Sequence, residues 1–179
     1  IYLFIGILAY LVFFQKEIYL KYKTLVVIGN LKKNFSRLIK LIHQNIDLIP
    51  RPILIQYGHT NIKKLKLNNN EVFYEKFIDN EKILLLIKDV EVVIAHCGAG
   101  IILETLSNKK RAYIIPREQK NGEHIDDHQI ELYNYLLKKN LILKFSDLKN
   151  KNNLINEFRF INNDNIDKYL RNYISNTIK

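Results

Sequence analysis

The chain has 179 residues, of which 47% are hydrophobic and 26% are charged, and its formal net charge is +10. This length allows one domain with a substantial core, and a single cysteine excludes an internal disulfide framework and suits a reducing compartment. The positive charge suggests nucleic acid or an anionic membrane as a partner. Because the lysines are scattered and no nucleic-acid motif is found, we expect no nucleic acid partner.

Residues 1–23 form a hydrophobic N-terminal segment. Residues 1–14 (IYLFIGILAYLVFF) are all apolar or aromatic apart from one glycine; as a helix they would measure about 21 Å, short of the roughly 20 residues that cross a bilayer. Lys21 and Lys23 follow, as is typical of a cytoplasmic flank. Three interpretations stay open: the end of a membrane helix, an interfacial anchor, and a helix that docks on a partner protein. We expect residues 1–20 to hold the protein at the cytoplasmic face of a membrane.

From residue 24 onward, apolar runs alternate with helical periods. The apolar runs predict strands at 24–29, 53–58, 71–77, 90–96, 111–116 and 141–145. Apolar residues at three- and four-residue spacing predict helices at 35–46, 79–88, 100–108, 126–139 and 166–174. This alternation predicts one α/β domain over residues 24–179, with a parallel sheet covered on both faces.

Small and polar residues follow several of the predicted strands. They are Gly29 and Asn30, then Gln56–Thr60, then His96–Gly100, and finally the loop after Pro116. In an open parallel sheet the ligand crevice lies beyond the carboxyl ends of the strands. We therefore expect these segments to meet at one edge of the sheet.

The stretch HCGAG at residues 96–100 lies between a strand and a helix. Small residues let a ligand approach the backbone, and free amides at a helix N-terminus favour a phosphate; a tight turn without a ligand is the alternative. The stretch is not the dinucleotide fingerprint, because the third glycine is absent. Cys97 is interpreted as a small turn residue rather than a nucleophile. Glu104, in the helix that follows, could accept hydrogen bonds from both hydroxyls of a ribose. Alternatively, its negative charge near the helix N-terminus could simply stabilise the helix through its dipole.

The stretch NGEHIDDHQ at residues 121–129 is rich in oxygen and imidazole groups. Five possible metal ligands fall within six positions: Glu123, His124, Asp126, Asp127 and His128. Because no HExxH arrangement and no CxxC pair is present, we expect no metal. Asp126 or Asp127 is a suitable N-cap for the next helix. His128 and Gln129, in its first turn, suit sugar hydroxyls.

These motifs together resemble the Alg13 family, the UDP-sugar-binding half of a split GT-B glycosyltransferase related to MurG. The resemblance covers residues 24 to about 145 and rests on IAHCGAGIILETLSNKKRAYIIP and DDHQIEL. QYGHT at 56–60 and PREQKNGEHIDDHQ at 116–129 resemble the bacterial exopolysaccharide branch of PssE-like and capsular transferase enhancer proteins. The resemblance implies a Rossmann-like doubly wound sheet that forms a single half of a GT-B fold.

The resemblance also implies roles for individual residues. The donor diphosphate would contact five consecutive residues: His96, Cys97, Gly98, Ala99 and Gly100. Glu104 would bind the ribose, and the donor sugar would contact Asp127, His128 and Gln129. Gly29 and Asn30 would face the diphosphate or the acceptor. Two positions depart from the family: Asn30 replaces a usual threonine, and Cys97 replaces a glycine or alanine.

The implied activity is inverting transfer of a hexose, of the GlcNAc, galactose or glucuronate type, from a UDP-sugar to a lipid-linked saccharide. The length allows only one half of a GT-B enzyme, so a membrane-bound Alg14-like or PssD-like subunit would supply the acceptor half. No cofactor is expected beyond the UDP-sugar itself. His96 is the candidate base within this chain, and the partner is the other possible source. A non-catalytic enhancer subunit and a small nucleotide-binding regulator are the alternative functions.

Overall fold

The computed structural model describes residues 22–150. The predicted hydrophobic segment, apart from its last two residues, and the predicted helix at 166–174 lie outside the described residues. Within residues 22–150, no helix is both long enough and apolar enough to cross a membrane.

In this described part of the chain, six parallel strands form one sheet in the order β3-β2-β1-β4-β5-β6. They are β1 (Thr24–Val27), β2 (Ile53–Gln56), β3 (Val72–Glu75), β4 (Val92–Ala95), β5 (Arg111–Ile114) and β6 (Leu143–Lys144). This is the order of Rossmann-like doubly wound sheets, which confirms the predicted fold class. Every residue of β1, β2 and β4 is buried, because helices cover both faces of the sheet.

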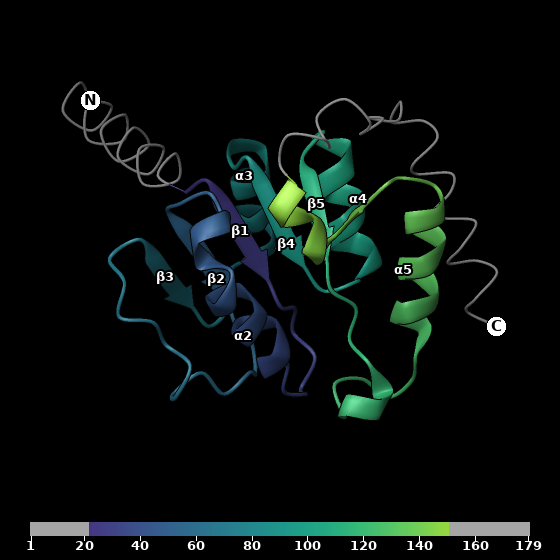
Figure 1. Cartoon of the computed structure of the whole chain (residues 1–179), viewed down its shortest axis with the longest axis horizontal. Helices are drawn as coiled ribbons and strands as arrows, with labels where there is room; N and C mark the ends of the chain where they lie inside the picture. The colour runs from purple at the N-terminus through teal and green to yellow at the C-terminus, as the bar shows by residue number, and fades with distance from the viewer. Residues whose placement is uncertain (1–21, 151–179) are drawn as a thin grey trace, which may run out of the picture.

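Within residues 22–150, four α-helices and two short 3-10 helices lie between the strands, and a third 3-10 helix follows β6. The α-helices are α2 (Ser36–Gln44), α3 (Asn80–Asp89), α4 (Ala99–Ser107) and α5 (His128–Lys138). The 3-10 helices are η1 (Ile46–Leu48), η2 (Gln119–Asn121) and η3 (Phe145–Asn150). One apolar cluster joins α3, α4 and α5 to one face of the sheet. A second cluster joins α2 to the opposite face (Figure 1).

The chain reverses its direction across the sheet between β1 and β4. From β1 the chain continues to β2 and β3 on one side, whereas β4, β5 and β6 lie on the other side. In Figure 1 the carboxyl ends of the strands point toward the lower edge, where η2 also lies. Val27 is paired with Ala95 at the ends of β1 and β4. The segments after these two residues therefore leave the sheet side by side, at the topological switch point where such folds bind ligands.

Candidate functional site

A pocket of about 500 Å³ lies at this switch point. Its wall combines the ends of β1 and β2, the segment after β4, and the facing sides of α3 and α4. The lining residues are Val27, Gly29, Asn30, Gln56, Asn80, Ile83, Leu84, His96, Gly98, Gly100, Ile101, Leu103 and Glu104. The predicted convergence of the β1, β2 and β4 loops at one edge is therefore confirmed.

Gln56 fixes the loop after β1. Its Oε1 accepts hydrogen bonds from the amides of Ile28 and Gly29, both at 3.1 Å, and its Nε2 donates to Asn30 Oδ1 at 3.3 Å. Gly29 has φ +84° and Gly58 has φ +53°, both in the left-handed region that favours glycine. A Cβ on Gly58 would also collide with the Gly29 carbonyl oxygen. The β1 loop is therefore held by the side chain and backbone that follow β2.

The imidazole of His96 fills the space beside two glycines. Its Nδ1 lies 3.3 Å from the Val27 carbonyl oxygen. A Cβ on Gly29 would lie 2.8 Å from His96 Cε1, and a Cβ on Gly98 would collide with His96 Nε2. Surrounding protein lowers the pKa of His96 to about 4, mainly through desolvation, with the charge of Arg117 adding to the effect. The ring is therefore neutral at physiological pH.

The N-terminus of α4 is open to the pocket. Gly98 is the N-cap residue, and no side chain caps the helix. The first amides of a helix have no partner within the helix, and they carry a partial positive charge. Gly98 and Gly100 both line the pocket, so these amides can bind a phosphate group.

Glu104 lies one turn further along α4, on the pocket wall. Its side chain is half-buried. Among residues 22–150, no hydrogen bond or ion pair joins its carboxylate to another residue. A carboxylate that lines a pocket without a protein partner can accept hydrogen bonds from a ligand, such as the hydroxyls of a ribose.

Cys97 lies between two pocket-lining residues but points the other way. It is 1% exposed and packs in the apolar cluster formed with α3, α4 and α5. Burial raises the pKa of its thiol, so the reactive thiolate is disfavoured. Ala99 also packs against this cluster. Neither side chain lines the pocket, so contact of these two residues with a ligand there would have to come from their backbone.

The predicted residues after β5 do not line the pocket. Gln129 is 5% exposed, and its Oε1 accepts a hydrogen bond from the Arg117 amide at 3.1 Å. Asp127 is the N-cap residue of α5 without a side-chain cap; its Oδ1 accepts from the Gln119 amide at 2.9 Å. His128 is paired with Asp126. The side chains of Gln129 and Asp127 therefore organise their own loop in the structure.

Arg117 joins the β5 loop to the β1 loop. Its side chain is 1% exposed, and its guanidinium stacks on the Phe35 ring at 4.6 Å. It donates to three carbonyl oxygens, those of Ile28 at 3.0 Å, Lys33 at 3.3 Å and Glu123 at 3.1 Å. Its Nε has no hydrogen-bond partner among the described residues. Burial lowers the pKa of Arg117 to about 10, so the group stays charged at neutral pH.

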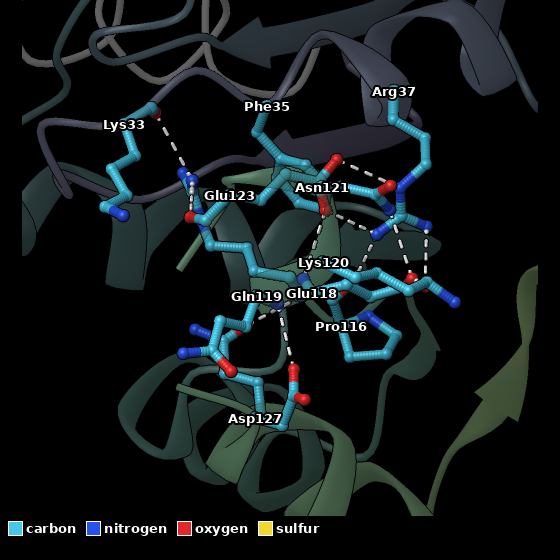
Figure 2. A network of polar contacts seen from close by, with 12 residues as sticks. Lys33, Phe35, Arg37, Pro116, Glu118, Gln119, Lys120, Asn121, Glu123 and Asp127 are labelled. Atoms are coloured by element: carbon cyan, nitrogen blue, oxygen red, sulfur yellow. Dashed lines mark hydrogen bonds and ion pairs between the residues drawn. The ribbon is translucent and has the colours of Figure 1, made fainter. Parts of the chain in front are cut away.

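A second arginine completes this network, which Figure 2 shows from close by. Arg37 of α2 binds both carboxylate oxygens of Glu123, with Nε at 3.0 Å and an η nitrogen at 2.6 Å. The same η nitrogen donates to the Pro116 carbonyl at 2.7 Å. Glu123 also accepts from the Glu118 amide at 3.1 Å. The carboxylates of Glu118 and Glu123 are thus paired with Arg37 of α2, and Glu118 also with Lys120.

Three further side chains of this loop form a separate cluster. His124 Nδ1 lies 3.0 Å from Asp126 Oδ1, and His128 Nδ1 contacts the same oxygen. The Asp126 carboxylate also accepts from the His128 amide at 3.3 Å, so Asp126 rather than Asp127 carries the bond typical of a cap. No metal was expected from the sequence spacing, yet the structure gathers two imidazoles and a carboxylate here.

The structure thus divides the predicted site residues into two sets. The pocket brings together Gly29, Asn30, His96, Gly98, Gly100 and Glu104. The other predicted side chains lie in the core or in the β5 loop. The sequence analysis missed Asn80, Ile83 and Leu84 of α3. One feature of the sequence could have indicated these residues: α3 follows β3, and the carboxyl end of β3 lies at the same edge of the sheet as the pocket. It also missed Arg37 and Arg117, which carry no spacing signal.

Two comparisons with known proteins give a match, and the family assignment depends on the first. Residues 24–172, most of the chain, match the family model of the glycosyltransferase family 28 C-terminal domain. A similar solved structure is that of the glycosyltransferase SnogD from Streptomyces nogalater, at 17% identity and a TM-score of 0.36. That match covers 54% of this chain and 26% of the SnogD chain. No curated protein matches the chain.

Proposed function

The chain belongs to the glycosyltransferase family 28 C-terminal domain family, and from this membership we propose that it is the UDP-sugar-binding subunit of a hexosyltransferase. The transferred hexose would be of the GlcNAc, galactose or glucuronate type, and the acceptor a lipid-linked saccharide. Within the family fold, the Rossmann-like sheet corresponds to one half of a GT-B enzyme.

The observation that carries this proposal is the pairing of two ligand-ready groups in one pocket. The uncapped N-terminus of α4 offers amides for a diphosphate. Glu104, one turn along the same helix, offers an unpaired carboxylate for ribose hydroxyls. A nucleoside diphosphate carries both of these ligand groups, a diphosphate and a ribose. The N-terminus of α4 and Glu104 follow one another along the helix in the order in which the diphosphate and the ribose follow one another in a UDP-sugar.

The proposed chemistry assigns binding and charge stabilisation to this chain. In inverting transfer, the leaving UDP gains negative charge, which the α4 amides stabilise without a metal. The acceptor hydroxyl must lose a proton to a base. His96 is the candidate within this chain, because its neutral ring faces the pocket between Gly29 and Gly98. A pKa near 4 makes it a weak base in the free protein, and a diphosphate bound beside it would raise that pKa.

We propose that the acceptor half comes from an Alg14-like or PssD-like membrane subunit. The resemblance of the sequence supports this partner, and the hydrophobic residues 1–14 followed by Lys21 and Lys23 support a place at the cytoplasmic face of a membrane. Co-expression with such a partner, assayed on a lipid-linked sugar, tests both statements.

Titration calorimetry with UDP tests the donor site directly. We expect the wild-type chain to bind UDP, and Glu104→Ala and Glu104→Gln to weaken binding by about tenfold or more, since a hydrogen bond to a charged group is worth about 1.5–3 kcal/mol. Glu131→Gln is a matched control, because Glu131 is exposed on α5 outside the pocket. The proposal would be overturned if the wild-type chain did not bind UDP and if the Glu104→Ala chain, reconstituted with its partner subunit, kept full transferase activity.

The base is tested separately in the reconstituted pair. If His96 removes the proton, His96→Asn lowers kcat by about 100-fold or more with little change in KM. A loss confined to KM would instead assign the base to the partner.

A non-catalytic enhancer subunit is the second candidate function, supported only by the resemblance to enhancer proteins. This function predicts that the chain stimulates a partner transferase and that replacement of Glu104 leaves the stimulation unchanged. The calorimetric titration and the Glu104→Ala pair therefore separate the two functions.

A further inference from the structure

The cluster of His124, Asp126 and His128 lies after β5 and does not line the pocket at the switch point. The candidate ligand atoms of these three side chains all lie within 4.8 Å of one another. The two imidazole rings meet edge to face, with centroids 4.5 Å apart. We propose that the three side chains bind a divalent transition-metal ion, with Zn²⁺ as the ion that fits best.

The donor set favours this class of ion. Two imidazoles and one carboxylate suit Zn²⁺ and its neighbours, whereas Mg²⁺ and Ca²⁺ prefer oxygen ligands. Zinc–ligand bonds of about 2.0–2.2 Å place ligand atoms roughly 3.3 Å apart in a tetrahedral site. The 3.0 Å between His124 Nδ1 and Asp126 Oδ1 is close to this spacing. Since all three ligand atoms already lie within 4.8 Å of one another, side-chain rotations that bring the remaining pairs to this spacing would admit the ion.

A cation can take the place of the proton between His124 and Asp126. Its Nδ1 faces the Asp126 carboxylate oxygen at 3.0 Å, and the Asp126 amide donates toward the same nitrogen at 3.4 Å. An imidazole nitrogen carries either a proton or a lone pair, so it cannot serve both contacts at once. A cation held by both Nδ1 atoms and the carboxylate oxygen would use the lone pairs of all three.

The backbone of the cluster is fixed from outside it. Lys33 Nζ donates to the His124 carbonyl at 3.1 Å, and Gln119 Nε2 donates to the Ile125 carbonyl at 2.9 Å. Glu123 is bound to Arg37, and Asp127 accepts from the Gln119 amide. The nearby carboxylates therefore have other partners, and Asp126 is the one directed at the imidazoles.

The site is open on one side. The His124 side chain is 10% exposed, whereas Asp126 is 50% and His128 is 47% exposed. Three protein ligands with an accessible face leave at least one coordination position for water or another ligand, as in zinc sites that are not purely structural.

Metal binding by the full chain, purified in detergent without a polyhistidine tag, tests the inference. Equilibrium dialysis against Zn²⁺ with metal analysis is expected to give about one ion per chain. His124→Ala and Asp126→Asn should each lower the affinity by at least about tenfold. Co²⁺ should give visible absorption bands typical of four- or five-coordinate sites, and these bands should be lost in both variants. All five histidines lie in the described part, and His59→Ala, an exposed histidine outside the cluster, should leave binding unchanged.

Substoichiometric binding to the wild type, or unchanged affinity in Asp126→Asn, would overturn the inference. Asp126 is half-exposed, so this variant decides the outcome even if His124→Ala does not fold, and circular dichroism checks its fold. The measurement reads the metal itself, so the inference stands or fails independently of the proposed donor.

Discussion

Two segments follow neighbouring strands of the sheet and were expected to bind one donor together. They differ in whether their polar groups have partners within the protein. The β4 segment, residues 96–104, leaves polar groups free: the α4 amides are uncapped and the Glu104 carboxylate has no partner among the described residues. In the β5 segment, residues 116–129, most charged groups are bound to one another, to the β1 loop or to Arg37 of α2.

This difference suggests that the β4 segment provides a binding surface and that the β5 segment holds neighbouring loops in position. Buried polar groups are normally satisfied by protein partners, so an unpaired group on a pocket wall is available to a ligand. A paired group instead contributes to the position of its loop. Through Arg117 and Arg37 the β5 segment fixes the β1 loop and α2, and we expect its variants to change stability first and binding second.

The largest effect is expected from Arg117→Met. Removal of the guanidinium leaves three carbonyl oxygens without their donor, and each buried acceptor that is left unsatisfied costs about 1–3 kcal/mol. The orphan Nε and the desolvation of the charge offset part of this cost. Urea denaturation should show the loss, while Lys120→Met, at a side chain 77% exposed, should change stability by less than about 0.5 kcal/mol. Equal stability of Arg117→Met and wild type would mean that the β5 segment is not a support.

The next effect concerns pH and tests the β4 segment. The pKa of His96 falls from 6.5 to about 4 on folding, so the unfolded chain binds a proton in this range that the folded chain does not. Stability should therefore decrease as pH falls from about 6.5 to about 4, by up to about 3 kcal/mol from this residue, and should not depend on it above that range.

His96→Asn isolates this contribution, because His43 and His124 also have lowered pKa values and remain in the variant. Denaturant titrations between pH 4 and 7, with a chelator present, should show a shallower slope for the variant. Arg117 and His124 are the charged or titratable groups that lower the pKa of His96 electrostatically. An identical slope in both proteins would contradict the lowered pKa of His96 in the folded chain.

A smaller effect is expected within the β5 segment itself. Glu123→Gln keeps the shape of a side chain that is 6% exposed but replaces one acceptor of Arg37 by a donor. Hydrogen bonds to charged groups are worth about 1.5–3 kcal/mol, so we expect a loss of about 2 kcal/mol in the free energy of unfolding. Glu118→Gln is the matched change, at a more exposed carboxylate 3.5 Å from Arg37, and should cost less than about 1 kcal/mol. A larger loss of unfolding free energy in Glu118→Gln than in Glu123→Gln would show that Glu118, rather than Glu123, is the more important partner of Arg37.

The smallest effects come from two glycines in the first turn of α4. A Cβ on Gly98 collides with the His96 ring, whereas a Cβ on Gly100 meets no atom within 4 Å. We expect Gly98→Ala to cost about 1–2 kcal/mol, because an overpacked side chain must move. Gly100→Ala should raise stability by about 0.5 kcal/mol, because the unfolded chain loses freedom. Thermal unfolding of the two variants checks the sign of each change, and a stabilised Gly98→Ala would show that His96 is free to move away.

Much of the fold could be predicted from the sequence. The β-branched runs at 53–58 and 90–96 and the spacing of Leu38, Ile39 and Ile42 reflect burial directly, because strands and helices expose faces with fixed periods. The predicted strands were too long at their carboxyl ends. The residues after Val27 and Ala95 leave the sheet, and several of them line the pocket, although the apolar character continues at buried Ile28.

The candidate site was predicted in part. The HCGAG stretch and Glu104 share a strand end and the helix after it, so local order along the chain places them correctly. Local order could not show that Cys97 faces the core, because a turn between strand and helix breaks the period that assigns faces. It also could not show that Gln129 is bound to the Arg117 amide.

By itself the sequence determined the class of fold, the order of its elements and the edge at which a ligand binds, because hydrophobic periods and the rules of parallel sheets are local or topological. Only the tertiary structure decided which polar groups stay free. Whether Glu104 faces a pocket, Glu123 meets Arg37 or His124 meets His128 depends on contacts between side chains. Arg37 and Glu123 lie 86 positions apart along the chain, and no pattern of spacing encodes such a distance.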